Sequence, residues 1–161
     1  MHSSVLEYVG RVVADHGLSS MRTLELGSSN VNGSVRDFFS GEYVGIDHVE
    51  GNGVDRVMNA NALEFEEGSF DVVVSTSMLE HDPAFWRTLP EVGRVLRPGG
   101  HFILTPVSTG FPIHNEPDYW RLTPQGLERL LRRAGFGTVE TWIDPACLAV
   151  GAVATREFQN V

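Results

Sequence analysis

The chain has a single cysteine and few basic residues. Cys147 stands alone among 161 residues, which excludes a framework of internal disulfides and fits a reducing compartment. Lysine and arginine together number 12 against 21 acidic residues, and the formal net charge of -9 repels the phosphates of nucleic acids and of anionic lipids. We therefore expect no membrane partner and regard a nucleic-acid substrate as disfavoured.

Long hydrophobic runs are also missing. No apolar run approaches the roughly 20 residues of a membrane-spanning helix, and the N-terminus does not combine a basic start with a continuous apolar segment. We therefore expect a soluble, cytoplasmic protein. A length of 161 residues with 42% hydrophobic content suits a single domain, residues 1–161, and leaves no room for a separate substrate domain.

The stretch from Arg22 to Asp47 organises the rest of the chain. It reads as a buried strand over 23–26, a polar turn, a short helix, and a second strand over 43–46 that ends on Asp47. An acid at the tip of the second strand, about 20 residues after the first turn, is the layout by which Rossmann-type units bind ribose hydroxyls. A nucleotide-like cofactor is therefore expected across the ends of these two strands.

The turn lacks the G-x-G-x-x-G pattern that closes on a pyrophosphate. The corresponding positions are Gly27, Ser29 and Asn32, and a further glycine appears only at Gly33. Backbone amides at such a turn are poorly placed to bind a pyrophosphate at a helix N-terminus. A nicotinamide-dependent oxidoreductase is therefore the less favoured alternative.

The remaining patterns alternate between helix and strand. Helical spacing of apolar residues follows Ser4, Pro83 and Pro124, and the face formed by Phe85, Trp86, Leu89 and Val92 is predicted to be core. Further strands are predicted over 54–58, 70–75, 102–107, 138–143 and 148–155. Strands that alternate with helices predict a doubly wound α/β sheet. Residues 108–121 have neither period, and a loop of this length in a compact domain is usually functional.

Several ordered motifs resemble those of the class I S-adenosylmethionine-dependent methyltransferases. After the Glu25 to Asn30 cluster, five segments match the family's pattern in order: Gly53-Val54-Asp55, Asn61-Ala62-Leu63-Glu64-Phe65, Ser69-Phe70-Asp71, Leu79-Glu80-His81, and Glu91 to Gly100. The resemblance covers about 23–136, and residues 114–122, HNEPDYWRL, are similar to a pattern in one branch of the family. Ser29 and Val31 stand where the family has glycines, and Asn61 stands where it often has aspartate.

The resemblance implies a Rossmann-like, seven-stranded, mostly parallel sheet with the last strand antiparallel, and S-adenosyl-L-methionine as the cofactor. The cofactor-binding residues that it implies are Glu25, Gly27, Ser28, Asp47, Asn61, Ala62 and Ser75. Gly27 would allow close backbone approach, Asp47 would bind the ribose, and Glu25 would orient the loop or bind the amino group of the methionine moiety. Asn61 would accept from adenine. The structural alternatives are a strand-exit glycine, a solvated strand end and plain turn residues.

On the acceptor side, His81 and His114 are the candidate catalytic residues, because an ordinary histidine pKa suits general base work near neutrality. The alternatives are that His81 caps the helix near Pro83 and that His114 fixes the loop. The 108–121 loop, with Trp120 and other aromatics, is expected to wall the acceptor site. Asp118 and Arg121 are expected to form a local ion pair. A second subunit could also supply cover, so a homodimer stays open.

The predicted function is S-adenosylmethionine-dependent methyl transfer to a small or medium-sized acceptor, in which positioning supplies most of the rate. The alternative from another class is a cofactor-binding regulatory subunit without catalysis. No acidic trio with metal-ligand spacing appears in a suitable loop, so we expect no metal requirement.

Overall fold

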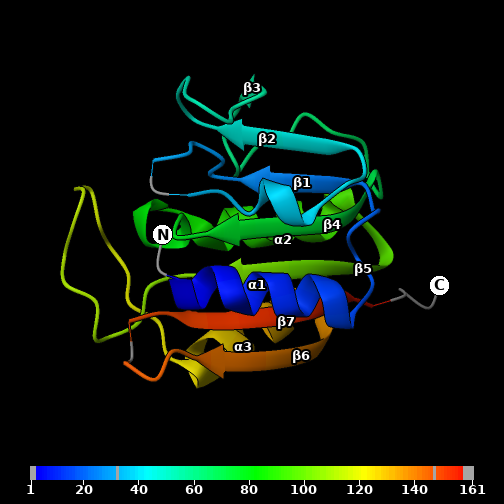
Figure 1. Cartoon of the computed structure of the whole chain (residues 1–161). Helices are drawn as coiled ribbons and strands as arrows, with labels where there is room; N and C mark the ends of the chain where they lie inside the picture. The colour runs from blue at the N-terminus through cyan, green and yellow to red at the C-terminus, as the bar shows by residue number, and fades with distance from the viewer. Residues whose placement is uncertain (1–2, 32, 147, 158–161) are drawn as a thin grey trace.

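A computed structural model describes residues 3–31, 33–146 and 148–157 of the chain (Figure 1). Cys147 lies outside these residues. The elements, in chain order, are α1 (Ser3–Asp15), β1 (Thr23–Leu26), the 3-10 helix η1 (Arg36–Phe38), β2 (Tyr43–Asp47), β3 (Arg56–Val57), β4 (Phe70–Thr76), the 3-10 helix η2 (Leu79–His81), α2 (Phe85–Val95), β5 (Leu96–Thr105), α3 (Pro124–Arg133), β6 (Phe136–Ile143) and β7 (Val150–Arg156).

The strands form one seven-stranded sheet in the order β3-β2-β1-β4-β5-β7-β6. The first five strands in this order pair in parallel, and β7 is antiparallel to both of its neighbours, β5 and β6. The α/β class, the seven strands and the antiparallel last strand predicted above are therefore confirmed. The strand order reverses between β1 and β4, and in such sheets ligands bind outside the carboxyl ends of the strands at this point.

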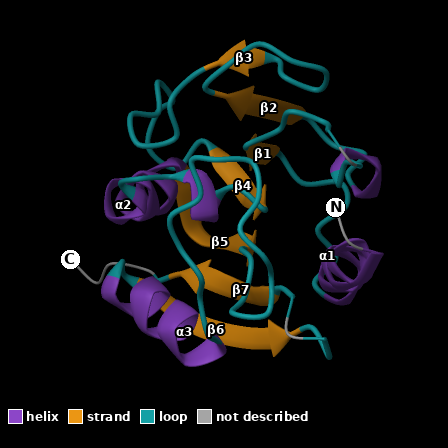
Figure 2. Ribbon diagram, turned by 90° about the vertical axis from the view of Figure 1, so that its left-hand side faces the viewer, coloured by secondary structure: helices purple, strands orange, loops and turns teal. Residues whose placement is uncertain are grey.

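Helices cover both faces of the sheet (Figure 2). The helix α1 lies on one face, whereas α2 and α3 lie on the other. Because successive strand residues point to opposite faces, Val72 and Val74 of β4 pack in the cluster with α1, whereas Val73 packs in the cluster with α2 and α3. This burial on both sides explains why β4 reads as a continuous apolar run rather than an alternating one.

Some predicted elements differ from the structure. The short helix before β2 is only the 3-10 turn η1, and the third strand shrinks to Arg56–Val57. The strand β5 begins at Leu96, directly after α2, and passes through the Pro98-Gly99-Gly100 segment with an irregular pairing between Phe70 and Val72 of β4. The prediction that Trp86 is core was wrong, since 55% of it is exposed.

Within the described ranges, no helix has both the length and the apolar character needed to cross a membrane.

Candidate functional site

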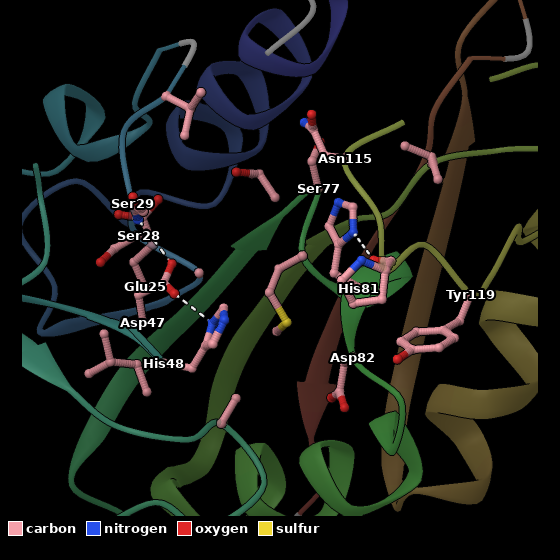
Figure 3. Close-up of a pocket in the computed structure, with 18 of the residues that line it drawn as sticks. Glu25, Ser28, Ser29, Asp47, His48, Ser77, His81, Asp82, Asn115 and Tyr119 are labelled. Carbon is pink, nitrogen blue, oxygen red and sulfur yellow. Dashed lines mark hydrogen bonds and ion pairs between the residues drawn. The ribbon is translucent and has the colours of Figure 1, made fainter. Parts of the chain in front are cut away.

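A cavity of about 690 Å³ lies over the carboxyl ends of β1, β2 and β4 (Figure 3). One part of its lining, the strand-end half, is made by residues at or after the carboxyl ends of β1, β2 and β3: Glu25, Gly27, Ser28, Ser29, Asp47, His48, Asn59, Ala60 and Asn61. The other part, the loop half, is made by η2 and by the long loop before α3: His81, Asp82, Phe111, His114, Asn115, Pro117 and Tyr119. The cavity therefore joins the two predicted groups of site residues.

The turn after β1 depends on Gly27. Its φ is +74°, which side chains other than glycine rarely adopt, and its N–H donates to the Ile46 carbonyl at 2.9 Å. A Cβ at this position would lie 2.7 Å from the side chain of Met78, which also lines the cavity. The glycine therefore keeps the turn close to both β2 and η2.

Asp47 ends β2 at the rim of the cavity. Its Oδ2 accepts from the Ser29 N–H at 3.3 Å, and its Oδ1 lies 2.8 Å from Nδ1 of the exposed His48. Only 10% of the Asp47 side chain is exposed. The carboxylate thus fastens the β1 turn to β2 and leaves oxygen lone pairs at the cavity, as a ribose-binding acid requires.

Glu25 lies on β1 beneath the same turn and is buried. Its Oε2 accepts from the Tyr43 hydroxyl at 2.9 Å. Burial raises the pKa of Glu25 to about 7; the Tyr43 hydrogen bond and the charge of Arg36 lower it, and Asp55 and Asp47 raise it. A positively charged group in the cavity would therefore be stabilised by the ionised form of this buried acid.

The other predicted cofactor residues are placed unevenly. Ser28 lines the cavity, is buried, and its hydroxyl has no hydrogen-bond partner among the residues described. Asn61 lines the cavity as well, but Ala62 is exposed and outside the lining, where Ala60 lies instead. Ser75 is fully buried in β4 and does not reach the cavity. Thr76, the last residue of β4, and Ser77, which follows the strand, line the cavity instead.

The two predicted catalytic histidines meet in the loop half. The rings of His81 and His114 contact edge to face, with centroids 5.4 Å apart, although the two residues are 33 positions apart in sequence. His81 Nδ1 is 2.7 Å from the Pro117 carbonyl. A carbonyl can only accept, so Nδ1 carries the proton and Nε2 is the free nitrogen of the neutral ring. The carbonyl therefore orients His81.

Polar contacts of side chains hold the long loop in place. Asp118, whose side chain is fully buried, forms the predicted ion pair with Arg121, at 2.5 and 2.7 Å. The Arg121 guanidinium also donates to the carbonyls of Phe111 and Pro112, 10 and 9 residues earlier. The hydrogen bonds from Arg121 to the Asp118 carboxylate, with that from the His114 backbone N–H, hold the pKa of Asp118 well below its usual range. The predicted ion pair is therefore confirmed, and it is a structural clamp within the loop.

The prediction that Trp120 walls the acceptor site was wrong. Trp120 lies outside the cavity lining and packs edge to face on Phe85 of α2, and its indole N–H donates to the Asp82 carbonyl at 2.8 Å. Its neighbour Tyr119 lines the cavity and is half exposed. Trp120 therefore fastens the loop to the core, and Tyr119 provides the cavity wall.

Sequence reasoning also missed some residues of the site. Ser77 and Asn115 line the cavity, and both have positive φ, 50° and 49°, an uncommon conformation for residues other than glycine. Glu80 is buried beside the two histidines, and burial raises its pKa. The Leu79-Glu80-His81 motif contained the signal for Glu80, whereas no sequence pattern marks the strained backbone.

Comparison with known sequences finds a matching domain model and similar proteins. A sequence model of the family described as methyltransferase domain matches residues 27–104. A fatty-acid O-methyltransferase from Mycolicibacterium smegmatis is 31% identical over 138 residues, which cover 75% of this chain and 49% of that protein. A demethylmenaquinone methyltransferase from Lactococcus lactis is 46% identical over 59 residues, 36% of this chain and 23% of that protein. The chain thus spans half or less of the length of these curated relatives.

Two solved structures share the fold. The 1,6-didemethyltoxoflavin-N1-methyltransferase of Burkholderia thailandensis, solved with bound 1,6-didemethyltoxoflavin and S-adenosylhomocysteine, is 19% identical with a TM-score of 0.77, and the match covers 96% of this chain and 79% of that one. A possible histamine N-methyltransferase of Thermotoga maritima is 18% identical with a TM-score of 0.71, over 95% and 92% of the two chains.

The sheet order, with a cavity over the point where it reverses and an acid at the end of β2, defines a Rossmann-like protein built to bind a nucleotide-like cofactor. The matched domain and the relatives narrow this class further. Together they make the chain similar to the class I S-adenosylmethionine-dependent methyltransferases, with residues 27–104 carrying the methyltransferase-domain match.

Proposed function

We propose that this protein transfers a methyl group from S-adenosylmethionine to a small or medium-sized organic acceptor. The observation that carries the proposal is that one cavity joins the two carboxylates of the strand-end half, Glu25 and Asp47, to the histidines of the loop half. Its volume of about 690 Å³ is within the usual range for small-molecule sites. The names of the fatty-acid, demethylmenaquinone and 1,6-didemethyltoxoflavin methyltransferases described above support the same activity.

The residues present fit this cofactor. The buried hydroxyl of Ser28 has no partner among the described residues, and Glu25 forms no ion pair among them, so both retain capacity for a ligand. Asp47 can accept from a ribose diol, Asn61 can bind a base edge, and Glu25 can balance the positive charge of an amino acid moiety. When bound, the cofactor supplies a methyl group already activated by its sulfonium.

The loop half serves the acceptor. His81 is held by the Pro117 carbonyl with its second nitrogen free, so it can accept the proton that a hydroxyl or amine acceptor loses as its bond to the methyl carbon forms. Phe111 and Tyr119 add aromatic walls to the same half, and the net charge of -9 disfavours a nucleic-acid acceptor. Positioning of the acceptor against the methyl group supplies most of the rate.

Calorimetry and a transfer assay test the proposal. The purified protein should bind S-adenosylmethionine and S-adenosylhomocysteine but not NAD, and preference for NAD would overturn the cofactor assignment. The protein should then methylate at least one compound in a panel of hydroxyl, carboxyl, amine and acidic C–H acceptors. Mass spectrometry detects the methylated product. Tight cofactor binding with no turnover on any acceptor, together with activation of a partner enzyme, would instead indicate a regulatory subunit.

One variant tests whether the two halves of the cavity have separate roles. His114→Ala should leave the affinity for S-adenosylmethionine within a few fold and lower turnover strongly, because His114 lies in the loop half. Equal losses of both would show that the loop half also holds the cofactor.

A further inference from the structure

Three potential metal ligands meet at the inner end of the loop half. Glu80 and His81 belong to η2, and His114 comes from the long loop before α3. Each can offer one ligand atom, and these three atoms lie within 4.8 Å of one another. We expected no metal requirement because no single loop carries an acidic trio with metal-ligand spacing. This cluster instead forms from two segments that only the fold brings together.

The cluster contains buried polar atoms that the described residues leave unsatisfied. Glu80 is 1% exposed, and neither of its carboxylate oxygens has a hydrogen bond of ordinary geometry. The backbone amides of Glu80 and Val107 lie near enough to offset part of the burial effect on its pKa. His114 Nδ1 is also buried and lies 3.4 Å from Asp118 Oδ2 without forming a hydrogen bond, so among the buried atoms of the cluster only the Glu80 oxygens lack both a hydrogen bond and an ion-pair partner among the described residues. Such groups are costly unless a ligand, a water or a metal satisfies them.

The histidines are already oriented in the way that metal ligands usually are. His81 donates Nδ1–H to the Pro117 carbonyl, which leaves Nε2 for a ligand. The ring of His114 lies beside Asp118, with Nδ1 3.4 Å from Oδ2, and its backbone N–H donates to the same oxygen at 3.0 Å. Arg121 fixes Asp118 in turn. Backbone carbonyls and carboxylates behind a histidine are the usual outer partners in metal sites.

We propose that Glu80, His81 and His114 form a three-ligand site for a divalent transition metal of the zinc class. Two imidazoles and one carboxylate are the donors that such ions accept, and a site with three protein ligands keeps a further position open. His81 and His114 line the cavity, so that position faces the acceptor side. Magnesium is disfavoured, because it prefers an octahedral shell of oxygen ligands.

The open position gives the ion a role that rests on the proposed function. With the ion on Nε2 of His81, that nitrogen would no longer be the base, and the ion would take over its part. An acceptor oxygen or nitrogen next to the cation would lose its proton to water more readily, so that its lone pair could form the bond to the methyl carbon as the carbon–sulfur bond breaks. Metal binding itself does not depend on this role. The two claims can therefore fail separately.

A cobalt titration tests the site without methyl donor or acceptor. Metal-free protein should bind one Co²⁺ per chain, with visible absorption of the intensity typical of four- or five-coordinate ions, and Zn²⁺ should displace it. Glu80→Gln, His81→Asn and His114→Asn should each weaken binding at least tenfold. The matched control is His16→Asn, which removes an exposed histidine near His101, far from η2 in the sequence, and should leave binding unchanged.

The outcomes decide the proposal even if a variant fails to fold. No saturable Co²⁺ binding by folded wild-type protein overturns it, and this measurement needs no variant. Binding that survives in folded Glu80→Gln, His81→Asn and His114→Asn, or that disappears in His16→Asn, also overturns it. Calorimetry with S-adenosylmethionine on the same samples distinguishes the failure of this site from the failure of the proposed function.

Discussion

The two halves of the cavity are held in place by different kinds of contact. In the strand-end half, the positions of Gly27 and Asp47 follow from sheet pairing and from backbone amides, such as the bond from Ser29 to Asp47. In the loop half, side-chain contacts hold the backbone in place. Arg121 bonds to distant residues of the loop, and Trp120 packs the loop against α2. The sheet therefore fixes the strand-end half rigidly. The loop half depends on a few replaceable side chains, and it can change without altering the sheet.

The largest expected effect is the loss of the anchor of the loop half. Trp120→Ala removes its packing on Phe85 and leaves the Asp82 carbonyl without its indole donor. Because Trp120 is partly buried, the free energy of unfolding should fall by about 3 kcal/mol, the lower end for buried aromatics. Chemical denaturation measures this. Tyr119→Ala is the matched control and should cost less than about 1 kcal/mol, since Tyr119 is half exposed.

If both variants were equally stable, the loop would not depend on Trp120, and the contrast between the halves would be lost.

An effect of similar size is expected from Glu25 in the strand-end half. Its folded-state pKa of about 7 lies above the ordinary 4.5, so its contribution to stability is fully present below pH 4.5 and is lost as the pH rises through 7. The difference between these two pKa values corresponds to a loss of about 3 kcal/mol in the free energy of unfolding. Stability curves of wild type and Glu25→Gln should therefore diverge in slope between pH 4.5 and 7 and run parallel above it.

The groups around Glu25 show why Glu25→Gln is a suitable comparison for this measurement. Tyr43 donates to it, Arg36 is the neighbouring cation, and Asp47 and Asp55 are the neighbouring anions. The glutamine carbonyl can still accept from Tyr43, so the variant keeps that hydrogen bond. Identical pH profiles for the two proteins would show that Glu25 ionises normally and has no special environment.

The next effect concerns cofactor affinity. Asp47→Ala should weaken binding of S-adenosylmethionine by about 1.5 to 3 kcal/mol, the range for hydrogen bonds to a charged group. The exposed Val49, which lies outside the cavity lining, gives the control, because Val49→Ala leaves the Asp47 carboxylate in place. Calorimetry on both folded variants measures the difference. Unchanged affinity in Asp47→Ala would make Asp47 a brace of the β1 turn and nothing more.

The smallest expected effect is at Asn61. Its amide lines the cavity, and its loss in Asn61→Ala should weaken cofactor binding by about 0.5 to 1.5 kcal/mol, as for a neutral hydrogen bond. Ala62→Ser serves as the control, because Ala62 is exposed and outside the lining. A larger loss for Ala62→Ser than for Asn61→Ala would reverse the placement of the two residues.

The strand-end half could be predicted from sequence because its chemistry is local. The turn at Gly27 and the acid at Asp47 belong to one short segment, and the apolar run of β4 identifies the central strand. Ser75 was misplaced by a single step, since Thr76 and Ser77 reach the cavity beyond it. A period of two along a strand makes such an error easy.

The loop half could not be predicted to the same extent, because its contacts link distant residues. Nothing in the order of residues shows that His81 meets His114, or that Trp120 turns inward whereas Tyr119 turns to the cavity. The ion pair between Asp118 and Arg121 was predictable because the two residues are three apart. Likewise, η1 is a single turn where a helix was expected, because sequence pattern does not determine element length.

The placement of β7 has a consequence for how the chain can fold during synthesis. β7 follows β6 in sequence but lies between β5 and β6 in the sheet. When β6 and α3 have left the ribosome, β6 therefore has no strand beside it, and the edge of β5 is open. Domains fold as units during synthesis, at roughly 5 to 20 residues per second. Docking of α3 and β6 onto the sheet thus waits for Val150–Arg156, and a nascent chain halted before those residues would expose the apolar edge of β5 to chaperones or to other chains.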